Sequence, residues 1–264
     1  MSGTPAPEPL VTYAVTDHIA VITYNRPDKL NAINGALRVD LNAAWERFRA
    51  DDDAWVAVVT GAGRAFCVGA DLQDGAGSAG TWPGSFWEIP TVNSFESGME
   101  LWKPTIAAVN GYCLGYGLTL VSACDFVIAA DDAEFGMPEV RLGVPTIVGA
   151  MRLPQRIGMQ AALELLLTGE RIDATRAQEM GLAGRVVPRA ELVDAAMSLA
   201  RRLCAGAPLA VRAVKEMAYR GQYLPWVDAV RMGETMRRVA AQTDDAREGM
   251  AAAREGRTPR WTGR

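Results

Sequence analysis

Two glycine-centred turns hold the residue types that could do chemistry in this 264-residue chain. The turns occupy residues 61–72 and 110–117, and each follows an apolar run typical of a buried strand. Such turns expose backbone N–H groups that neither strand nor helix uses, and the second turn also opens a predicted helix. Two amides that converge on one point would form an oxyanion hole. Glycine turns after strands are common, so spacing alone leaves a purely structural role open.

Other chemistries find little support in the sequence. The single histidine, His18, falls in a predicted hairpin turn, which argues against a metal centre and against a Ser-His-Asp or Cys-His hydrolase. Phe66 and Leu120 stand where a dinucleotide-binding fingerprint needs its third glycine, and no Walker-type Gly-Lys-Ser/Thr occurs. We therefore predict no metal and no cofactor.

Charge and cysteine usage limit the partners and the compartment. The net charge of −4 is mild and its signs are interleaved, so we predict no nucleic-acid binding. Residues 112–124 are too short and too interrupted by glycine to span a bilayer, and residues 1–9 lack the pattern of a signal peptide. The cysteines form no close pair, and three of the four lie in apolar runs. Reduced core thiols in a cytoplasmic protein are the expectation.

Alternating strands and helices must position the two turns. Helical periodicity begins after a plausible cap at Asn34, and residues 117–123 are typical of a short buried helix. The pattern predicts an α/β fold with parallel βαβ units, followed by a helical C-terminal part. The predicted strands are 10–15, 19–24, 56–60, 105–109 and 126–129, and the later helices are 155–168, 173–180, 190–204, 208–220 and about 225–240.

Residues 73–98 form a long segment without predicted regular structure. It is rich in Gly, Ser and Pro, yet contains Trp82, Phe86, Trp87 and Phe95. Long loops of this kind often border binding sites. A role beside the substrate and simple packing both stay open.

Four segments resemble successive signatures of the crotonase (enoyl-CoA hydratase/isomerase) superfamily, in the family's order. They are residues 26–32 (Arg-Pro-Asp-Lys-Leu-Asn-Ala), 65–72, 103–117 and 135–143 (Phe-Gly-Met-Pro-Glu-Val-Arg-Leu-Gly). The likeness spans about residues 10–260. It implies a spiral core of ββα units over residues 1–190 and a C-terminal helical trimerisation region over residues 191–264. It also implies an acyl-CoA thioester substrate and a homotrimer or a dimer of trimers.

The resemblance places the oxyanion hole at the backbone N–H groups of Ala70 and Tyr116. The family usually has glycine at the second position, so Tyr116 is a departure. Its amide donor survives, but its bulk is expected to narrow the acyl pocket. Residues that match the family's coenzyme A-binding segments are Lys29, Ala32, Asp71 and Leu72.

The proton-transfer groups depart further from the family pattern. Hydratases of the family have two glutamates; Glu139 matches the second, and Thr119 stands in place of the first. A threonine hydroxyl can hold water but cannot act as an ionised base. Asp71, Asp74 and Glu134 stay open as substitutes.

The resemblance implies an acyl-CoA enzyme that stabilises a thioester enolate, and three functions remain open. The first is an enoyl-CoA hydratase or hydratase-like lyase, including one acting on aryl-enoyl-CoA. The second is an isomerase that converts 3-enoyl-CoA to 2-enoyl-CoA with Glu139 alone. The third, of another class, is a non-catalytic acyl-CoA-binding protein.

Overall fold

The computed structural model describes residues 9–73 and 94–264, and within them a main sheet of six strands has the order β1-β2-β3-β5-β7-β10. β1 and β2 form an antiparallel hairpin, and every other neighbouring pair is parallel. Residues of β3, β5 and β7 are mostly buried, as expected for parallel strands covered on both faces. The strands are β1 (Val11–Thr16), β2 (Ile19–Tyr24), β3 (Val56–Gly61), β5 (Thr105–Val109), β7 (Phe126–Ala130) and β10 (Arg185–Val187).

A second, small sheet has the order β4-β6-β8-β9 among the described residues, and its strands alternate along the chain with those of the main sheet. Its strands are β4 (Ala65–Cys67), β6 (Tyr112–Leu114), β8 (Glu134–Gly136) and β9 (Arg171–Asp173). A strand of each sheet and then a helix follow one another repeatedly, as in β5-β6-α2 and β7-β8-α3. The small sheet carries the turns that form the candidate site.

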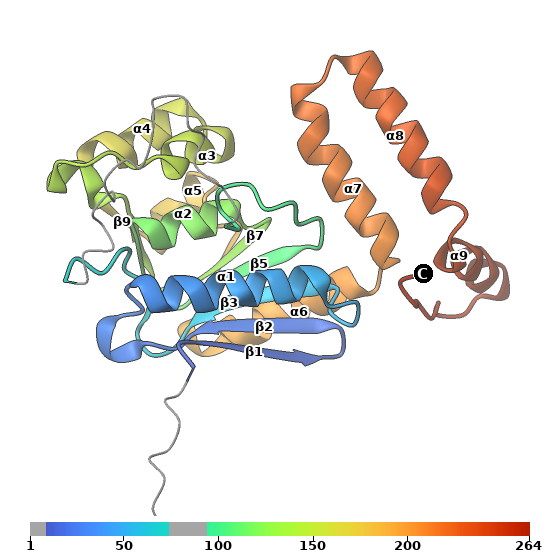
Figure 1. Ribbon diagram of the computed structural model, residues 1–264, viewed down its shortest axis with the longest axis horizontal. Helices are drawn as coiled ribbons and strands as arrows, with labels where there is room; N and C mark the ends of the chain where they lie inside the picture. Colours follow the sequence, from blue (N-terminus) through green and yellow to red (C-terminus); the bar gives the residue numbers. More distant parts are fainter. Residues whose placement is uncertain (1–8, 74–93) are drawn as a thin grey trace, which may run out of the picture.

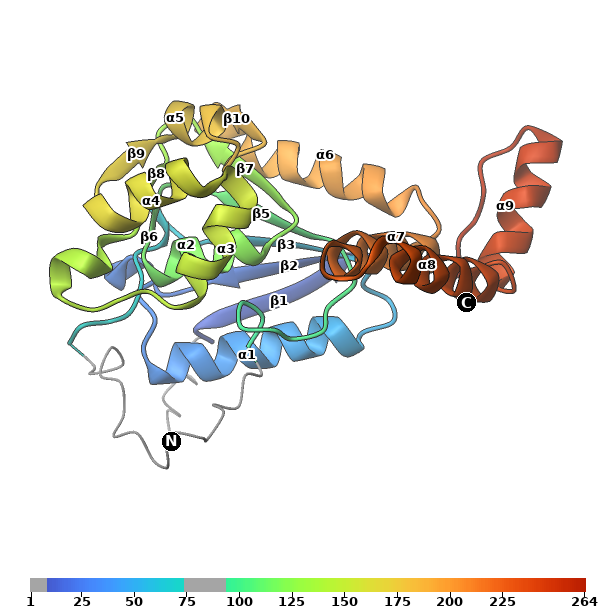
Figure 2. The same ribbon diagram turned by 90° about the horizontal axis from the view of Figure 1, so that it is seen from above.

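Helices cover both faces of the main sheet. α1 contacts β1 and β2, whereas α6 contacts β3, β5 and β7, and Figure 2 shows the two helices on opposite sides of the strands. The α-helices of the described residues are α1 (Gly35–Ala50), α2 (Tyr116–Ala123), α3 (Val148–Ile157), α4 (Met159–Thr168), α5 (Ala174–Glu179), α6 (Leu192–Cys204), α7 (Pro208–Arg220), α8 (Trp226–Ala240) and α9 (Asp244–Glu255). The same part of the chain contains four short 3-10 helices, at Pro27–Lys29, Pro138–Leu142, Arg189–Glu191 and Gly221–Tyr223.

The predicted α/β class is confirmed, and each of the five predicted strands agrees with an observed one to within one residue. The Asn34 cap is confirmed as well, because its Oδ1 accepts a hydrogen bond of 2.9 Å from the Leu37 amide. Asp173 caps α5 in the same way, at 2.7 Å from the Arg176 amide. His18 lies in the β1–β2 turn as predicted, with φ +64° and its ring stacked on Trp55.

The predicted helix over 155–168 is wrong in extent. Two helices, α3 and α4, occupy this region and meet at Gly158. Gly158 has φ +82°, a left-handed value that ends a helix and that glycine adopts without steric cost.

The four cysteines are free thiols, as predicted: Cys67, Cys113 and Cys124 are buried and Cys204 is partly buried. Burial raises the pKa of the Cys67 thiol to about 12, which keeps it protonated at neutral pH.

Asn31 joins the loop after β2 to the start of the small sheet. It is fully buried and has φ +57°. Its Oδ1 accepts from the Arg26 amide at 2.9 Å, while its Nδ2 donates to the carbonyl oxygens of Ala62 at 3.0 Å and Ala65 at 2.8 Å. This one side chain therefore connects the loop after β2 with the turn between β3 and β4.

Replacing Asn31 with Ala is expected to lower the free energy of unfolding by about 2–4 kcal/mol, because buried polar groups lose partners and the left-handed backbone loses its asparagine. Urea denaturation of both proteins measures the change. Asn34→Ala, which removes only the α1 cap, is the matched control and is expected to cost about 1 kcal/mol. An Asn31→Ala loss no larger than that of the control would show that this junction contributes little.

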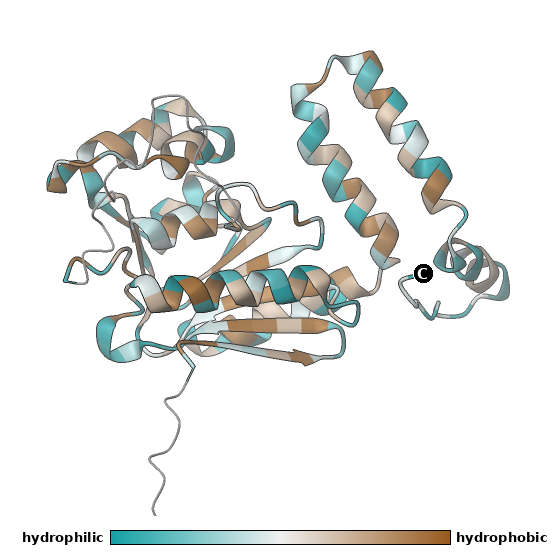
Figure 3. Ribbon diagram, in the orientation of Figure 1, coloured by the Kyte–Doolittle hydropathy of each residue, from teal (hydrophilic) through white to brown (hydrophobic). Residues whose placement is uncertain are grey.

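The C-terminal helices extend away from the α/β body. Figure 1 shows α7 and α8 as an antiparallel pair beside the body, with α9 beyond them. Figure 3 shows brown apolar patches between polar ones along this pair. Several of its apolar side chains are exposed, and Trp226 at 81% is the most exposed of them. The boundary at residue 190 stays a prediction; α6, just after it, packs on the main sheet.

Candidate active site

The first predicted oxyanion residue, Ala70, lies in the turn that follows β4. Gly69, with φ +99°, precedes it. The Ile33 amide donates to Gly69 O at 2.8 Å, and the Asp71 amide donates to Ile33 O at 3.0 Å. These bonds flank Ala70, whose own N–H has no hydrogen-bond partner within residues 9–73 and 94–264. An unpaired amide between two paired ones is available to a ligand.

The second predicted oxyanion residue, Tyr116, is the first residue of α2. Gly115 precedes it with φ +54°, and the Gly115 amide donates to Gly136 O at 2.8 Å. The Tyr116 N–H, like other amides in the first turn of a helix, makes no hydrogen bond to any described residue. The helix dipole adds positive potential at this end.

The two turns lie against each other. A Cβ added to Gly69 would be 3.4 Å from the Tyr116 amide nitrogen and 3.2 Å from Leu114 O. The small sheet causes this proximity, because β4 and β6 are parallel neighbours and each runs into one of the turns. Two adjacent, unbonded amides are the arrangement that an oxyanion hole requires. Their role in binding a thioester oxygen stays a prediction.

Glu139 lies beside the second turn. It belongs to the 3-10 helix Pro138–Leu142, which follows β8, and its Oε1 would be 3.1 Å from a Cβ on Gly115. Its Oε2 is buried and finds no hydrogen-bond partner in the described part of the chain. Burial raises the pKa of this carboxyl above the usual 4.5, and the residue's own amide opposes the rise in part. A buried carboxyl with a raised pKa and one unused oxygen is suited to proton transfer.

Thr119 lies one turn after Tyr116 on α2 and is 4% exposed. Residues three apart share a face of a helix, so the Thr119 hydroxyl and the Tyr116 side chain lie on the same face. The Oγ1 atoms of Thr119 and Thr146 would be 3.1 and 3.0 Å from a Cβ on Gly149. Two hydroxyl groups therefore gather near the first turn of α3.

Arg26 connects two of the predicted coenzyme A-binding residues, Ala32 and Asp71. Arg26 Nη1 donates to Asp71 Oδ2 at 2.6 Å and to Ala32 O at 2.9 Å. The Arg26 hydrogen bond is the main cause of the lowered pKa of Asp71. Lys29 and Leu72 are exposed beside this pair, where they are free to contact a ligand.

The alternative acids are occupied or outside the described residues. Asp71 is engaged by Arg26, and Glu134 forms an ion pair of 3.2 Å with Arg171. Asp74 lies outside the described residues, as do Trp82, Phe86 and Trp87. Phe95 is buried and stacks on Trp45 of α1 at 4.1 Å, so its contact is a packing one.

Sequence reasoning missed Glu96, a buried carboxyl that contacts a predicted site residue. It is 4% exposed, and its Oε1 accepts a hydrogen bond of 2.5 Å from the Tyr116 hydroxyl. The Tyr116 ring also lies under the Arg38 guanidinium, 5.3 Å from the ring centroid. No periodicity or motif marks Glu96; only the fold brings it to Tyr116.

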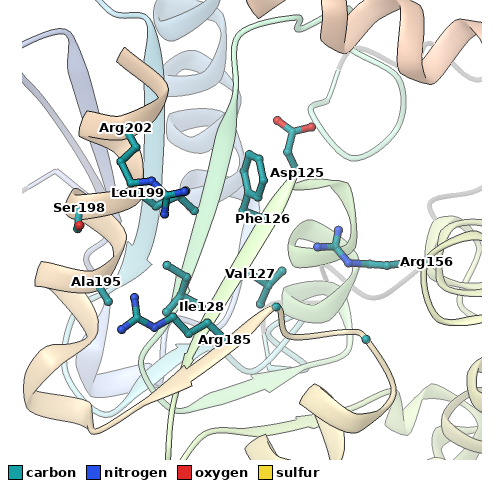
Figure 4. A pocket seen from close by; sticks show the side chains of 12 residues that line it. Asp125, Phe126, Val127, Ile128, Arg156, Arg185, Ala195, Ser198, Leu199 and Arg202 are labelled. Atoms are coloured by element: carbon teal, nitrogen blue, oxygen red, sulfur yellow. The ribbon is translucent and has the colours of Figure 1, made fainter. Parts of the chain in front are cut away.

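A cavity of about 320 Å³ on another part of the body contains none of the predicted site residues (Figure 4). Arg185 on β10 and Arg202 on α6 point into it from one side, and Arg156 approaches from α3.

Within the described ranges, His, Cys, Asp and Glu side chains form no group that could hold a metal ion. None of the described helices combines the length and the apolar character needed to cross a membrane.

Comparison with known proteins identifies the class. A family model described as enoyl-CoA hydratase/isomerase matches residues 15–264. The chain therefore belongs to the enoyl-CoA hydratase/isomerase family and is an acyl-CoA enzyme of its lyase or isomerase type. The family predicted from the sequence is confirmed.

Individual relatives match over nearly the whole chain. (E)-Benzylidenesuccinyl-CoA hydratase of Thauera aromatica is 36% identical over 255 residues, covering 96% of this chain and 99% of that protein. Carnitinyl-CoA dehydratase of Proteus mirabilis is 38% identical over 253 residues, covering 92% and 94%. The crystal structure of enoyl-CoA hydratase from Mycobacterium tuberculosis H37Rv superposes with a TM-score of 0.87 at 36% identity, covering 97% of this chain and 100% of that one. These likenesses confirm the crotonase-type fold.

Proposed function

We propose that this protein adds water across the double bond of a 2-enoyl-CoA thioester. The observation that carries the proposal is the Glu139 carboxyl, buried with one unused oxygen beside the turn that presents the Tyr116 amide. The relatives named as hydratases and a dehydratase support water addition over isomerisation. The Thr119 hydroxyl lies on the Tyr116 face of α2, and its proposed role is to hold the water.

In the proposed reaction, the thioester oxygen accepts hydrogen bonds from the amides of Ala70 and Tyr116. Ionised Glu139 takes a proton from water while the water oxygen bonds to the β-carbon, and the double-bond electrons move onto the thioester as an enolate. Each preorganised donor stabilises this enolate by about 3 kcal/mol. Protonated Glu139 then returns the proton to the α-carbon, so that one carboxyl completes the addition and no cofactor takes part.

A panel of thioesters tests the proposal. We expect 2-enoyl-CoA esters, aryl-enoyl-CoA among them, to give products heavier by one water, with the oxygen of ¹⁸O-labelled water incorporated. Mass spectrometry of the products measures both. Conversion of 3-enoyl-CoA to 2-enoyl-CoA without added oxygen would replace the proposal by the isomerase. Tight binding of acyl-CoA without turnover would replace it by the non-catalytic binder.

The raised pKa of Glu139 predicts the pH dependence. Only the ionised carboxylate accepts a proton from water, so kcat/KM should fall as pH decreases through the pKa of Glu139 in the free enzyme. Because burial raises that pKa, we expect the acidic limb at a higher pH than the usual glutamate value of 4.5. A pH–rate profile measures it. A limb at or below 4.5 would contradict the assignment of Glu139 as the base.

We also propose that coenzyme A binds across Lys29, Ala32, Asp71 and Leu72.

A third proposal concerns assembly: the chain forms a homotrimer or a dimer of trimers. Exposed apolar side chains on α7 and α8 support self-association, as does a groove of about 570 Å³ between α7 and the body. Light scattering during size-exclusion chromatography measures the mass of the assembly.

The four unpaired cysteines support a cytoplasmic location.

A further inference from the structure

A hydrogen bond joins the Tyr116 side chain to Glu96, and the proposed reaction does not use it. The Tyr116 hydroxyl donates to Glu96 Oε1 at 2.5 Å, and Glu96 is 4% exposed. Burial and the neighbouring Glu96 raise the pKa of the Tyr116 phenol, so this hydroxyl remains a donor at neutral pH. A buried carboxyl therefore holds the far end of a side chain whose backbone amide lines the candidate oxyanion hole.

Glu96 is itself fixed by its surroundings. Ser94 Oγ donates to the same Oε1 at 2.5 Å, and Arg152 Nε of α3 donates to Glu96 O at 2.9 Å. The preceding residue, Phe95, is buried with its ring stacked on Trp45 of α1. Contacts with α1 and α3 thus hold Glu96, and its carboxyl is buried.

The backbone on either side of Tyr116 has little freedom. Gly115 adopts φ +54° before it. After it, Gly117 lies so close to β4 that a Cβ would be 2.3 Å from Cys67 O. The side-chain anchor at Glu96 and this backbone contact hold the first turn of α2 at two separate points. The glycine that family members usually carry at this position has no side chain with which to form the first of them.

We propose that Glu96 is a positioning residue: through the Tyr116 hydroxyl it holds the first turn of α2 so that the Tyr116 N–H points at the thioester oxygen. This role rests on the proposed function of Tyr116 in the oxyanion hole. A donor contributes only when it lies about 2.7–3.1 Å from the oxyanion. A displacement of about 1 Å can cost roughly 100-fold in rate, so the loss should appear in kcat more than in KM.

The test compares Tyr116→Phe, Glu96→Gln, Glu96→Ala and the double variant Tyr116→Phe/Glu96→Ala. Tyr116→Phe and Glu96→Ala should each lower kcat about 10- to 100-fold with KM changed less than about threefold. The double variant should lose no more than either single one, since both remove the same bond. Glu96→Gln should retain most of kcat, because its amide oxygen still accepts from the phenol. Tyr219→Phe, which removes a 3.0 Å hydrogen bond to Asp125 on another part of the protein, is the matched control.

A spectroscopic measurement separates positioning from general stability. Butanoyl-CoA labelled with ¹³C at the thioester carbonyl cannot be hydrated, so its bound carbonyl resonance reports polarisation by the oxyanion hole even if the parent hydrates no ester. We expect the resonance to move toward its free value in Tyr116→Phe and Glu96→Ala and to stay near the parent in Glu96→Gln and Tyr219→Phe. An unchanged resonance and kcat, with only a lower melting temperature, would overturn the positioning role. So would losses that add in the double variant.

Discussion

Replacing Glu139 with Gln is expected to lower kcat/KM for hydration by about 10²–10⁴-fold, the usual contribution of a positioned general acid–base group. The substitution keeps the shape of the side chain and the acceptor oxygen beside Gly115. It removes the group that takes the proton from water and returns it to the α-carbon. Steady-state kinetics with the ester that the panel identifies measures the loss.

The surroundings of Glu139 allow this substitution without disturbing the fold. Glu139 Oε2 has no protein partner among the described residues, so an amide in its place breaks no hydrogen bond of the fold. Because the substitution removes an ionisable group whose charged form is disfavoured by burial, it should leave the free energy of unfolding unchanged or raise it by about 1 kcal/mol. The matched control is Glu134→Gln, which changes a glutamate of β8 that pairs with Arg171. If Glu139→Gln retains the parent rate, Glu139 takes no part in the reaction.

Much of the fold could be predicted because its longer strands and helices are long enough to show a recognisable pattern of apolar residues. β2, β3 and β5 are runs of five or six mostly apolar residues, and α1 repeats its buried side chains at helical spacing. The strands of the small sheet have three residues each, which is too short for a period of two to be recognised. The break at Gly158 was missed because a single glycine within an apolar helical pattern is compatible with a continuous helix.

The sequence indicated the two turns, Thr119 and Glu139 of the candidate site, but it did not indicate Glu96. Ala70 and Tyr116 follow glycine turns that a reader can find in the sequence, and the fold places those turns in contact. Glu96 stands 20 residues before Tyr116 without a periodic relation to it, and the bond between them exists only through tertiary packing. Likewise, the unused oxygen of Glu139 is a property of its surroundings and not of its residue type.

Replacing Gly117 with Ala is expected to lower kcat/KM by about 100-fold or more, because it should separate the two halves of the oxyanion hole. In an open helix the same change stabilises by about 1 kcal/mol. Here the added Cβ would lie 2.3 Å from Cys67 O and 2.9 Å from Cys67 Cβ, so α2 must move away from β4. Tyr116 moves with α2, whereas Ala70 follows β4 three residues after Cys67, and the distance between their amides increases.

Steady-state kinetics and the ¹³C resonance of bound butanoyl-CoA measure this separation together. We expect the resonance of Gly117→Ala to shift toward the free value in proportion to the loss of rate, since the thioester oxygen then reaches only one donor well. Gly221→Ala is the matched control: its φ is −61°, and the nearest described atom to its added Cβ would be Ala229 Cβ, at 3.8 Å. That variant should retain the parent rate and resonance. If Gly117→Ala also retains both, hydration does not depend on the spacing of the Ala70 and Tyr116 amides, and the chemistry must depend on another part of the site.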